Sequence, residues 1–537
     1  MARGDERIAP SFVLHIWLND MPGVAVASFL LLLLGGALAA LIAAAPPDIA
    51  NIFADLYLRH VLLFTTLQAA LSALISVALA LPVARALARR GRFPGRTLLL
   101  RLFGLPMVMP AIVAVFAIVA LYGESGWLHW LLAKMGLSTG GFLYGLSGIL
   151  IAHVFFNMPF AARAFLAALE AVPGESWRLA SQLGMASGPV FRLIEWPALR
   201  GTVASVAGLV FMLCFASFAI TLTLGGGPAW ASLEAAIYQA LRYDFDLGRA
   251  AVLALVQLAV SGALLLALHR LLLPAPVSLG LGRAMARPDV AGRGGAIVDG
   301  VLIALAGLYV GLPMLSVAIA GSSAAMVPVL GAAATWKAVG IGLGVAAAAT
   351  MLAIGGALLL IAGGQRLACP GAFQFIGSLP LAASPLALGA GLFVLLTRLG
   401  GSLEMGLGLV ALINGLMGMP YVMRVVAPAA REAAERHDRL CASLDIRGWN
   451  RWRLIDGPLL RRPVGLAMAL VAALSLGDLG AIALFGTPET ATLPLLIYQQ
   501  LAAYRLDAAA ATSLLLVVLT FGCFILIERL VGGPAHD

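Results

Sequence analysis

Long runs of apolar residues, divided by short polar stretches, recur along the whole chain. Twelve of them have the roughly 20 residues that a helix needs to cross a hydrocarbon core of about 30 Å. They lie at 22–45, 60–83, 99–122, 143–168, 202–224, 248–273, 296–320, 337–362, 372–397, 404–428, 463–486 and 508–531. Strands of a membrane barrel would alternate over about ten residues, whereas these runs are continuous. The pattern predicts an all-α integral membrane protein with about 12 transmembrane helices.

The composition supports this interpretation. Of the 537 residues, 62% are hydrophobic and only 11% are charged, with a mean hydropathy of +1.01. A soluble protein of ordinary composition has about 25% charged residues, so most of this surface must face a lipid bilayer. The net charge of +9 would suit nucleic acid, but basic residues on cytoplasmic loops explain it more simply. We therefore expect no nucleic-acid partner.

The arginines predict the orientation of the chain. The loop after the second run, RALARRGRFPGRTLLLR, holds six arginines, whereas the loop after the first run holds Asp48 and Asp55. Basic loops stay in the cytosol, so the first loop is expected outside and the second inside. Alternation along twelve spans then leaves 27 of the 34 basic residues inside. An even number of spans places both termini in the cytosol.

The four cysteines, Cys214, Cys369, Cys441 and Cys523, are far apart and form no CxxC motif. Neither a disulfide nor a metal site is therefore expected. The seven histidines also form no His-rich or paired-acid constellation, which disfavours a membrane enzyme.

A charged loop occurs twice in the chain. Residues 178–200 read RLASQLGMASGPVFRLIEWPALR, and residues 439–461, at an offset of 261, read RLCASLDIRGWNRWRLIDGPLLR, with nine of 23 positions identical. NMPFAAR and GMPYVMR match before the loop, and two segments that begin IYQ match after it. We interpret the chain as two parallel six-helix repeats, 1–273 and 296–537, joined by a cytoplasmic linker at 274–295. Such a duplication places a pseudo-two-fold axis along the membrane normal.

Each loop copy predicts a short amphipathic helix followed by a turn. In the first copy a helix can begin at Pro173, which suits a first turn, and continue to Leu183. Gly184 then suits a left-handed terminating position, and Asp445 replaces it in the second copy. Asp tolerates that conformation better than most residues. Two such helices could dock into grooves of a two-fold symmetric partner; alternatively, they are solvated loops whose repetition only records duplication.

Both loops resemble the EAA motif of inner-membrane permease subunits of ABC importers. That motif has the form EAA, three residues, G, nine residues, I, one residue, L-P. The positions that match in the first half are Arg178, Ala180, Leu183, Gly184, Ile194 and Pro197, and those in the second half are Arg439, Cys441, Leu444, Asp445, Ile455 and Pro458. The spacing is intact in both, although Arg replaces the acidic residue in each copy and the second copy lacks the glycine.

Further segments, among them HVFFNMP, LGGGP and LSLGDLGAIALFG, resemble importer permeases for thiamine and thiamine diphosphate. Related permeases for ferric iron share the duplicated layout. The resemblance implies the type I ABC importer permease fold, in a bacterial inner membrane, with one copy of the chain per transporter. It also implies two partners: a cytosolic ATPase dimer on coupling helices near 173–188 and 434–449, and a periplasmic thiamine-binding protein.

ATP hydrolysis is expected on another chain. A P-loop needs GxxxxGK[ST], yet the two lysines here, Lys134 and Lys337, precede Met135 and Ala338. This chain is therefore expected to be no enzyme and to bind no cofactor, whereas ATP and Mg²⁺ serve the partner ATPase.

Four polar residues in the apolar runs are candidates for the translocation path. Asp478 stands in LSLGDLGA, and Ser217 is its counterpart in the first half. A charge at mid-bilayer costs roughly 2.5–3.5 kcal/mol, so Asp478 should face the path or bond to neighbouring helices. His153 and Asn157 lie one helical turn apart and could line the path or form interhelical hydrogen bonds.

Two questions stay open from the sequence. An ATP-independent secondary carrier would also suit twelve spans, although it should not carry the spaced motif twice. The residues also do not distinguish thiamine from its phosphates or from another solute.

Overall fold

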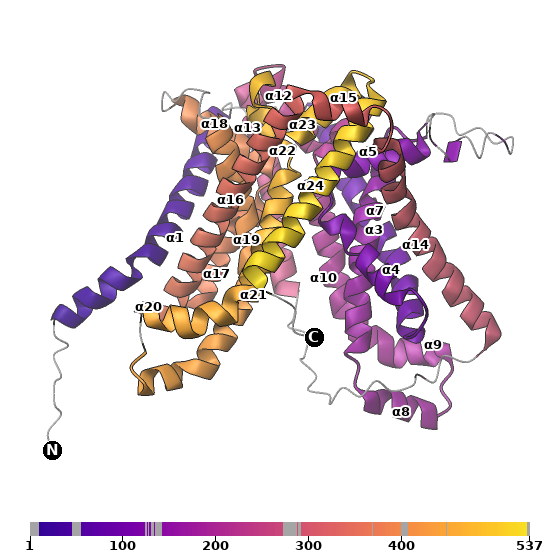
Figure 1. Cartoon of the computed structure of the whole chain (residues 1–537), viewed down its shortest axis with the longest axis horizontal. Coiled ribbons are helices and arrows are strands. Elements are labelled where there is room, and N and C mark those ends of the chain that lie inside the picture. The colour runs from indigo at the N-terminus through magenta and orange to yellow at the C-terminus, as the bar shows by residue number, and fades with distance from the viewer. Residues whose placement is uncertain are drawn as a thin grey trace.

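The computed structural model describes residues 10–45, 55–123, 126, 128–129, 134, 142–271, 287, 292–367, 369–398, 406–446 and 448–533. Within them the regular elements are helices, and the chain forms a helical bundle (Figure 1). The long helices of the first half are α1 (Pro10–Ala44), α3 (Leu56–Arg89), α7 (Leu146–Glu170), α10 (Trp196–Phe215) and α13 (Leu247–Leu271). Those of the second half are α14 (Arg293–Gly321), α16 (Ala333–Arg366), α19 (Gly406–Ser443), α21 (Gly457–Leu476) and α24 (Leu506–Gly532).

Among the described residues, ten helices are long and apolar enough to cross a membrane, and a bent pair would make eleven. These ten coincide with ten of the twelve predicted spans. The all-α membrane fold is therefore confirmed, whereas two of the spans are not continuous helices.

The third predicted span, 99–122, is a pair of helices bent by 115°. Its parts are α4 (Arg96–Leu102) with the 3₁₀ turn η1 (Leu105–Met107), and α5 (Ala111–Tyr122). The predicted span is bent where Pro106 and Pro110 lack the N–H that a continuous helix requires.

The ninth predicted span, 372–397, is divided in the corresponding place. It consists of α17 (Pro370–Ser378), the 3₁₀ turn η5 (Leu379–Ala382) and α18 (Pro385–Arg398). Pro380 and Pro385 interrupt it for the same reason. Both halves thus break their third apolar run.

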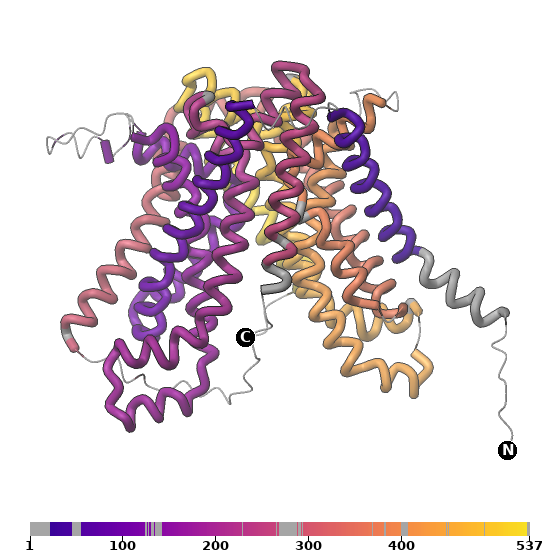
Figure 2. Tube along the Cα trace, turned by 180° about the vertical axis from the view of Figure 1, so that it is seen from behind, coloured from indigo at the N-terminus to yellow at the C-terminus, as the bar shows by residue number. Residues whose placement is uncertain are grey.

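Helix α1 packs against the opposite half of the chain. Its neighbours are α16, α17 and α18 of the second half, and α13, as Figure 2 shows from behind. Gly23 permits the approach, because a β-carbon there would lie 2.8 Å from the Cα of Gly363. Small residues let membrane helices approach closely where no water drives them together.

Helix α14 makes the reciprocal crossing, because it packs on α3 and α5 of the first half. The Tyr309 hydroxyl donates to the carbonyl of Ile151 at 2.7 Å, and the Ser316 hydroxyl donates to that of Ala117 at 3.0 Å. The first helix of each half therefore completes the other half's bundle. Sequence halves and packing bodies are not the same sets of helices.

The bundle has two different ends (Figure 1). At one end the halves meet around the short helices α12 (Leu233–Arg242), α22 (Gly480–Phe485) and α23 (Leu493–Ala502). Toward the other end the ribbons diverge, and there lie α8 (Gly174–Gln182) and α20 (Gly448–Arg451). We refer to the end with α8 and α20 as the coupling end.

Most of the predicted linker, 274–295, lies outside the described residues. Arg287 is described, and α14 begins at Arg293, three residues before the predicted start of the second repeat at 296.

Candidate functional site

The first predicted coupling helix is present as α8, which begins directly after Pro173 and has Leu183 as its C-cap. Gly184 has a φ of +60°, so the predicted left-handed conformation is confirmed. The Met185 N–H donates to the carbonyl of Ala180 at 3.0 Å, which closes the helix in the manner of a Schellman motif.

The second copy ends in the same way. Asp445 has a φ of +51°, and the Ile446 N–H donates to the carbonyl of Cys441 at 2.9 Å. A separate helix over 434–449 does not form, however, because α19 runs without interruption to Ser443. Ala434 stands where the first half has Pro173, and alanine continues a helix that proline would end.

Large apolar side chains are exposed at matching positions of both coupling segments. Leu179 and Leu183 are 57% and 65% exposed, and their counterparts Leu440 and Leu444 are 51% and 61% exposed. Residues four apart lie on one helix face, so each segment presents two leucines on one face.

The opposite face of each segment is anchored to the protein. Ala180 and its counterpart Cys441 are buried, and Trp177 packs with Ala180 and Val190 in a small apolar cluster that Ile194 also contacts. Ile455 is half-buried in the same position of the second copy. The motif isoleucines thus attach the segments to the body, while Arg178, Arg439, Pro197 and Pro458 are exposed.

A buried ion pair that the sequence analysis missed holds the first coupling loop. Glu195, next to Ile194, has a fully buried carboxylate that accepts from Arg85 Nε at 2.6 Å and from Arg287. The Arg287 guanidinium also lies 4.3 Å from the centre of the Trp177 ring on α8. Nearby, Arg89 at the end of α3 and the following residue, Arg90, bind Asp299 of α14 at 2.8 and 3.1 Å. Arginines on α3 thus tie together the coupling loop and the second half's first helix.

The second half carries a similar but more exposed arrangement. Asp456, the counterpart of Glu195, accepts from Arg451 Nε at 3.0 Å, and Arg451 also pairs with Asp438 at 2.6 Å. The acid before the motif proline is therefore paired with arginine in both copies. An acid recurs at this position in both copies, 261 residues apart. That recurrence was the sequence signal that could have identified the ion pair.

Asp478 caps the short helix α22. Its Oδ1 accepts from the Gly480 N–H and its Oδ2 from the Ala481 N–H, both at 3.1 Å. The structure therefore gives this carboxylate local hydrogen bonds at a break after α21. Its counterpart Ser217 lies at the equivalent break after α10, where its carbonyl accepts from the Thr221 hydroxyl.

His153 and Asn157 are buried between helices of the first half. His153 Nδ1 is 2.9 Å from the Ser72 hydroxyl of α3. Asn157 Nδ2 donates to the carbonyl of His153 at 2.8 Å and to the Cys214 sulfur at 3.4 Å. Both side chains thus make the predicted interhelical contacts.

Polar and small residues join the two halves at the end opposite the coupling end. Glu234 on α12 is fully buried and receives a hydrogen bond from Gln257, and Ser384 of the second half lies near its carboxylate. Helix α12 lies between two spans, and burial raises the pKa of the Glu234 carboxyl to about 7. A β-carbon on Gly477 would lie 3.0 Å from Cβ of Pro110. These contacts close the seam between the halves.

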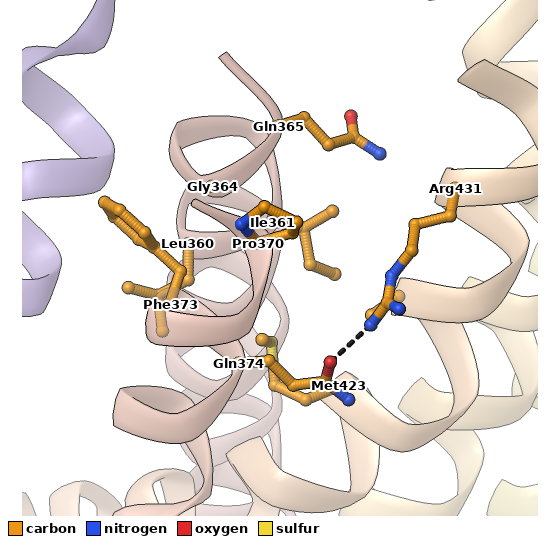
Figure 3. A pocket seen from close by; sticks show the side chains of 10 residues that line it. Leu360, Ile361, Gly364, Gln365, Pro370, Phe373, Gln374, Met423 and Arg431 are labelled. Carbon is orange, nitrogen blue, oxygen red and sulfur yellow. Dashed lines mark hydrogen bonds between the residues drawn. The ribbon is translucent and has the colours of Figure 1, made fainter. Parts of the chain in front are cut away.

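One pocket lies within the second half (Figure 3). It is formed by α16, α17 and α19 and is mostly apolar, with a hydrogen bond from Arg431 to Gln374 at its rim. Because all of its lining residues belong to the second half, it is not a path between the halves. Among the described residues, no three His, Cys, Asp or Glu side chains converge as a metal site.

The fold and the paired coupling segments define a class: a polytopic α-helical membrane permease built from a duplicated unit. The profile of the family described as "Binding-protein-dependent transport system inner membrane component" matches residues 79–276. Full-length relatives are the thiamine transport system permease proteins ThiP of several bacteria. The protein of Brucella abortus is 43% identical over 513 residues, covering 94% of each chain.

ThiP of Escherichia coli is 42% identical over 96% of this chain and 97% of its own length. ThiP of Haemophilus influenzae is 39% identical over 93% of each. The chain therefore belongs to this family of binding-protein-dependent transport permeases. It is a multi-pass inner-membrane protein and a transport subunit, and its family is not one of enzymes.

Proposed function

We propose that this chain is the permease subunit of an ATP-driven importer that carries thiamine from the periplasm to the cytosol. A cytosolic ABC ATPase dimer docks on α8 and on the last turns of α19, and a periplasmic thiamine-binding protein docks at the opposite end. One copy of the chain supplies both halves of the path. Both termini lie in the cytosol.

The observation that carries this proposal is the pair of matched leucine faces. Leu179 and Leu183 repeat as Leu440 and Leu444, and all four are more than half exposed. Exposed apolar residues that recur on symmetry-related surfaces favour a two-fold symmetric partner. The ATPase binds ATP and Mg²⁺, and this chain binds no cofactor.

The segments can transmit motion because they are attached to the body. Buried Ala180 and Cys441 and the paired acids Glu195 and Asp456 hold each segment to the long helices. When ATP binding closes the ATPase dimer, both segments move together and the halves rotate about the seam at the other end. Such rigid-body switching requires no flexible element between the coupling end and the seam.

Similarity to thiamine permeases over nearly the whole chain supports thiamine as the solute. The decisive experiment reconstitutes the chain with its ATPase and binding protein in liposomes and measures uptake and ATP hydrolysis. Thiamine should be taken up and should stimulate ATP hydrolysis, whereas ferric iron should do neither. Thiamine phosphates are tested in separate reactions. Uptake of thiamine by the chain without the ATPase would contradict the proposal and indicate a secondary carrier.

Docking is tested by the double variant Leu183→Glu, Leu444→Glu. Two buried, unpaired carboxylates at the interface should reduce ATPase co-purification by more than about ten-fold, while the chain still accumulates in the membrane. Leu183→Met with Leu444→Met keeps the apolar surface and is the matched control. If the ATPase co-purifies equally with the Glu and Met double variants, the leucine faces are not where the ATPase docks.

A further inference from the structure

Four aromatic side chains gather at the end opposite the coupling end, where α12, α22 and α23 meet in Figure 1. The Phe218 and Tyr238 ring centres lie 5.2 Å apart, and those of Tyr238 and Tyr243 lie 5.8 Å apart. Tyr498 of the second half lies near both tyrosines, because its phenol raises the pKa of Tyr238 and the Tyr243 phenol raises the pKa of Tyr498. The cluster therefore contains rings from both halves.

Duplication shows where this cluster lies. Tyr238 and Tyr498 are counterparts, because each follows an isoleucine and precedes a glutamine in segments offset by 260 residues. A two-fold axis places related residues on opposite sides of it, at equal distances. Tyr238 and Tyr498 can therefore both lie near Tyr243 only if both lie close to the axis. In a permease with parallel repeats, the path between the halves follows that axis. The tyrosines therefore lie at one mouth of the path.

Residues of the second half lie beside the Phe218 ring. A β-carbon on Gly480 would lie 3.9 Å from Phe218 Cδ1 of the other half and 3.6 Å from Cβ of Pro385. The same position is 3.5 Å from Asp478 Oδ1. Gly480 thus has the Asp478 carboxylate and the Phe218 ring as neighbours, so a carboxylate lies near the aromatic cluster.

The exposure of the rings decreases inward. Tyr243 is 63% exposed, whereas Tyr238 is 5% and Phe218 is 7% exposed. Burial raises the pKa of the Tyr238 phenol, and the Tyr243 and Tyr498 phenols raise it further, so the Tyr238 hydroxyl stays neutral. The neighbouring cation, Arg242, extends across the seam toward the carbonyl of Gly486. Asp244 and Asp246 are exposed on the turn beyond Tyr243.

We propose that Tyr238, Tyr243, Tyr498 and Phe218 form an entry site that receives a flat organic cation on its aromatic rings and passes it toward Asp478. Aromatic rings attract organic cations through the negative face of the π-system, most strongly where water is excluded. The site rests on the proposed function, because thiamine is such a cation. A simple apolar seal would also close this end, but a seal would not require rings.

The test compares Tyr238→Leu with Tyr238→Phe in the complete transporter, with its ATPase and binding protein, in lipid nanodiscs. Binding of radiolabelled thiamine is measured after trapping with ATP and vanadate. Loss of the ring in the Leu variant should weaken binding about ten-fold, and uptake should fall accordingly. The Phe variant, which keeps the ring, should stay within about two-fold of wild type. An uncharged thiazole analogue of thiamine should lose no affinity in the Leu variant.

Phe29→Leu on α1, where the ring is 52% exposed and distant from α12 in the chain, is the matched control for loss of a ring. If Tyr238→Leu does not assemble, Tyr498→Leu should show the same shift. Wild-type affinity in an assembled Leu variant would overturn the site while leaving thiamine import intact. A wild-type transporter that neither binds nor carries thiamine would overturn the proposed function, and the site with it.

Discussion

Arg287, in the segment between the two halves, forms an ion pair with Glu195 beside the first coupling helix. The same guanidinium lies over Trp177 of α8, and Arg85 of α3 binds the other carboxylate oxygen of Glu195. The inter-half segment is therefore attached to the element that we propose receives motion from the ATPase. The first coupling segment is braced by Arg85 of its own half and by Arg287 of the linker, whereas the second is braced by its own residues, Arg451 and Asp456.

Replacing the buried acid should destabilise the first coupling loop. Glu195→Gln leaves Arg85 and Arg287 without their shared counter-charge, and breaking such a buried pair costs about 3 kcal/mol. The thermal unfolding midpoint of the purified permease should fall by several degrees. Asp456→Asn, at a site whose side chain is 23% exposed, is the control and should cost about 1 kcal/mol or less. Equal midpoints for wild type and Glu195→Gln would contradict the bracing role.

The left-handed turns at Gly184 and Asp445 should tolerate some substitutions and not others. A β-carbon on Gly184 would meet no atom within 4 Å, so the penalty there is conformational and not steric. Gly184→Val should cost about 1–2 kcal/mol and reduce ATPase co-purification without preventing membrane insertion. Gly184→Asn, which tolerates positive φ, should retain co-purification, and Asp445→Gly should match or exceed wild type. If Val and Asn behave alike at position 184, the turn conformation is not required for docking.

The crossing of α1 depends on Gly23. A β-carbon there would lie 2.7 Å from the carbonyl oxygen of Leu359 and 2.8 Å from Cα of Gly363, whereas one on Gly35 would meet nothing within 4 Å. Gly23→Ala should therefore destabilise the assembled permease by about 1–3 kcal/mol, and Gly35→Ala on the same helix should be neutral. Thermal unfolding in detergent measures both. Similar midpoints for the two variants would indicate that α1 does not pack closely on α16.

Two roles of Asp478 can be separated by conservative change. Asp478→Asn keeps an acceptor for the Gly480 N–H but removes the charge, whereas Asp478→Ala removes the cap at a cost of about 1 kcal/mol. If the carboxylate attracts a cationic solute, the Asn variant should keep its stability and lose several-fold in thiamine uptake. Normal uptake by Asn together with reduced stability of Ala would assign Asp478 to capping alone.

The coupling loops show how far local sequence predicts structure. Gly184 and Asp445 were expected in left-handed turns, and both have positive φ, because helix termination depends on neighbouring backbone groups. The separate second helix expected near 434–449 does not form, because α19 is continuous to Ser443; Ala434 in place of Pro173 is the sequence signal that could have predicted this. The prolines at 106, 110, 380 and 385 likewise carried the signal that two apolar runs would break.

Other features depend on contacts between distant segments. Glu195 and Arg287 are 92 residues apart, and no local pattern pairs one arginine among many with that acid. Long apolar runs and the repeated loop were sufficient to establish an all-helical membrane protein with two related halves, because lipid requires continuous helices whatever their partners. Only the tertiary structure decided that α1 and α14 exchange halves and that tyrosines from both repeats lie close together. Those outcomes depend on which small residues permit close packing, and many pairings of apolar helices satisfy the same hydrophobic pattern.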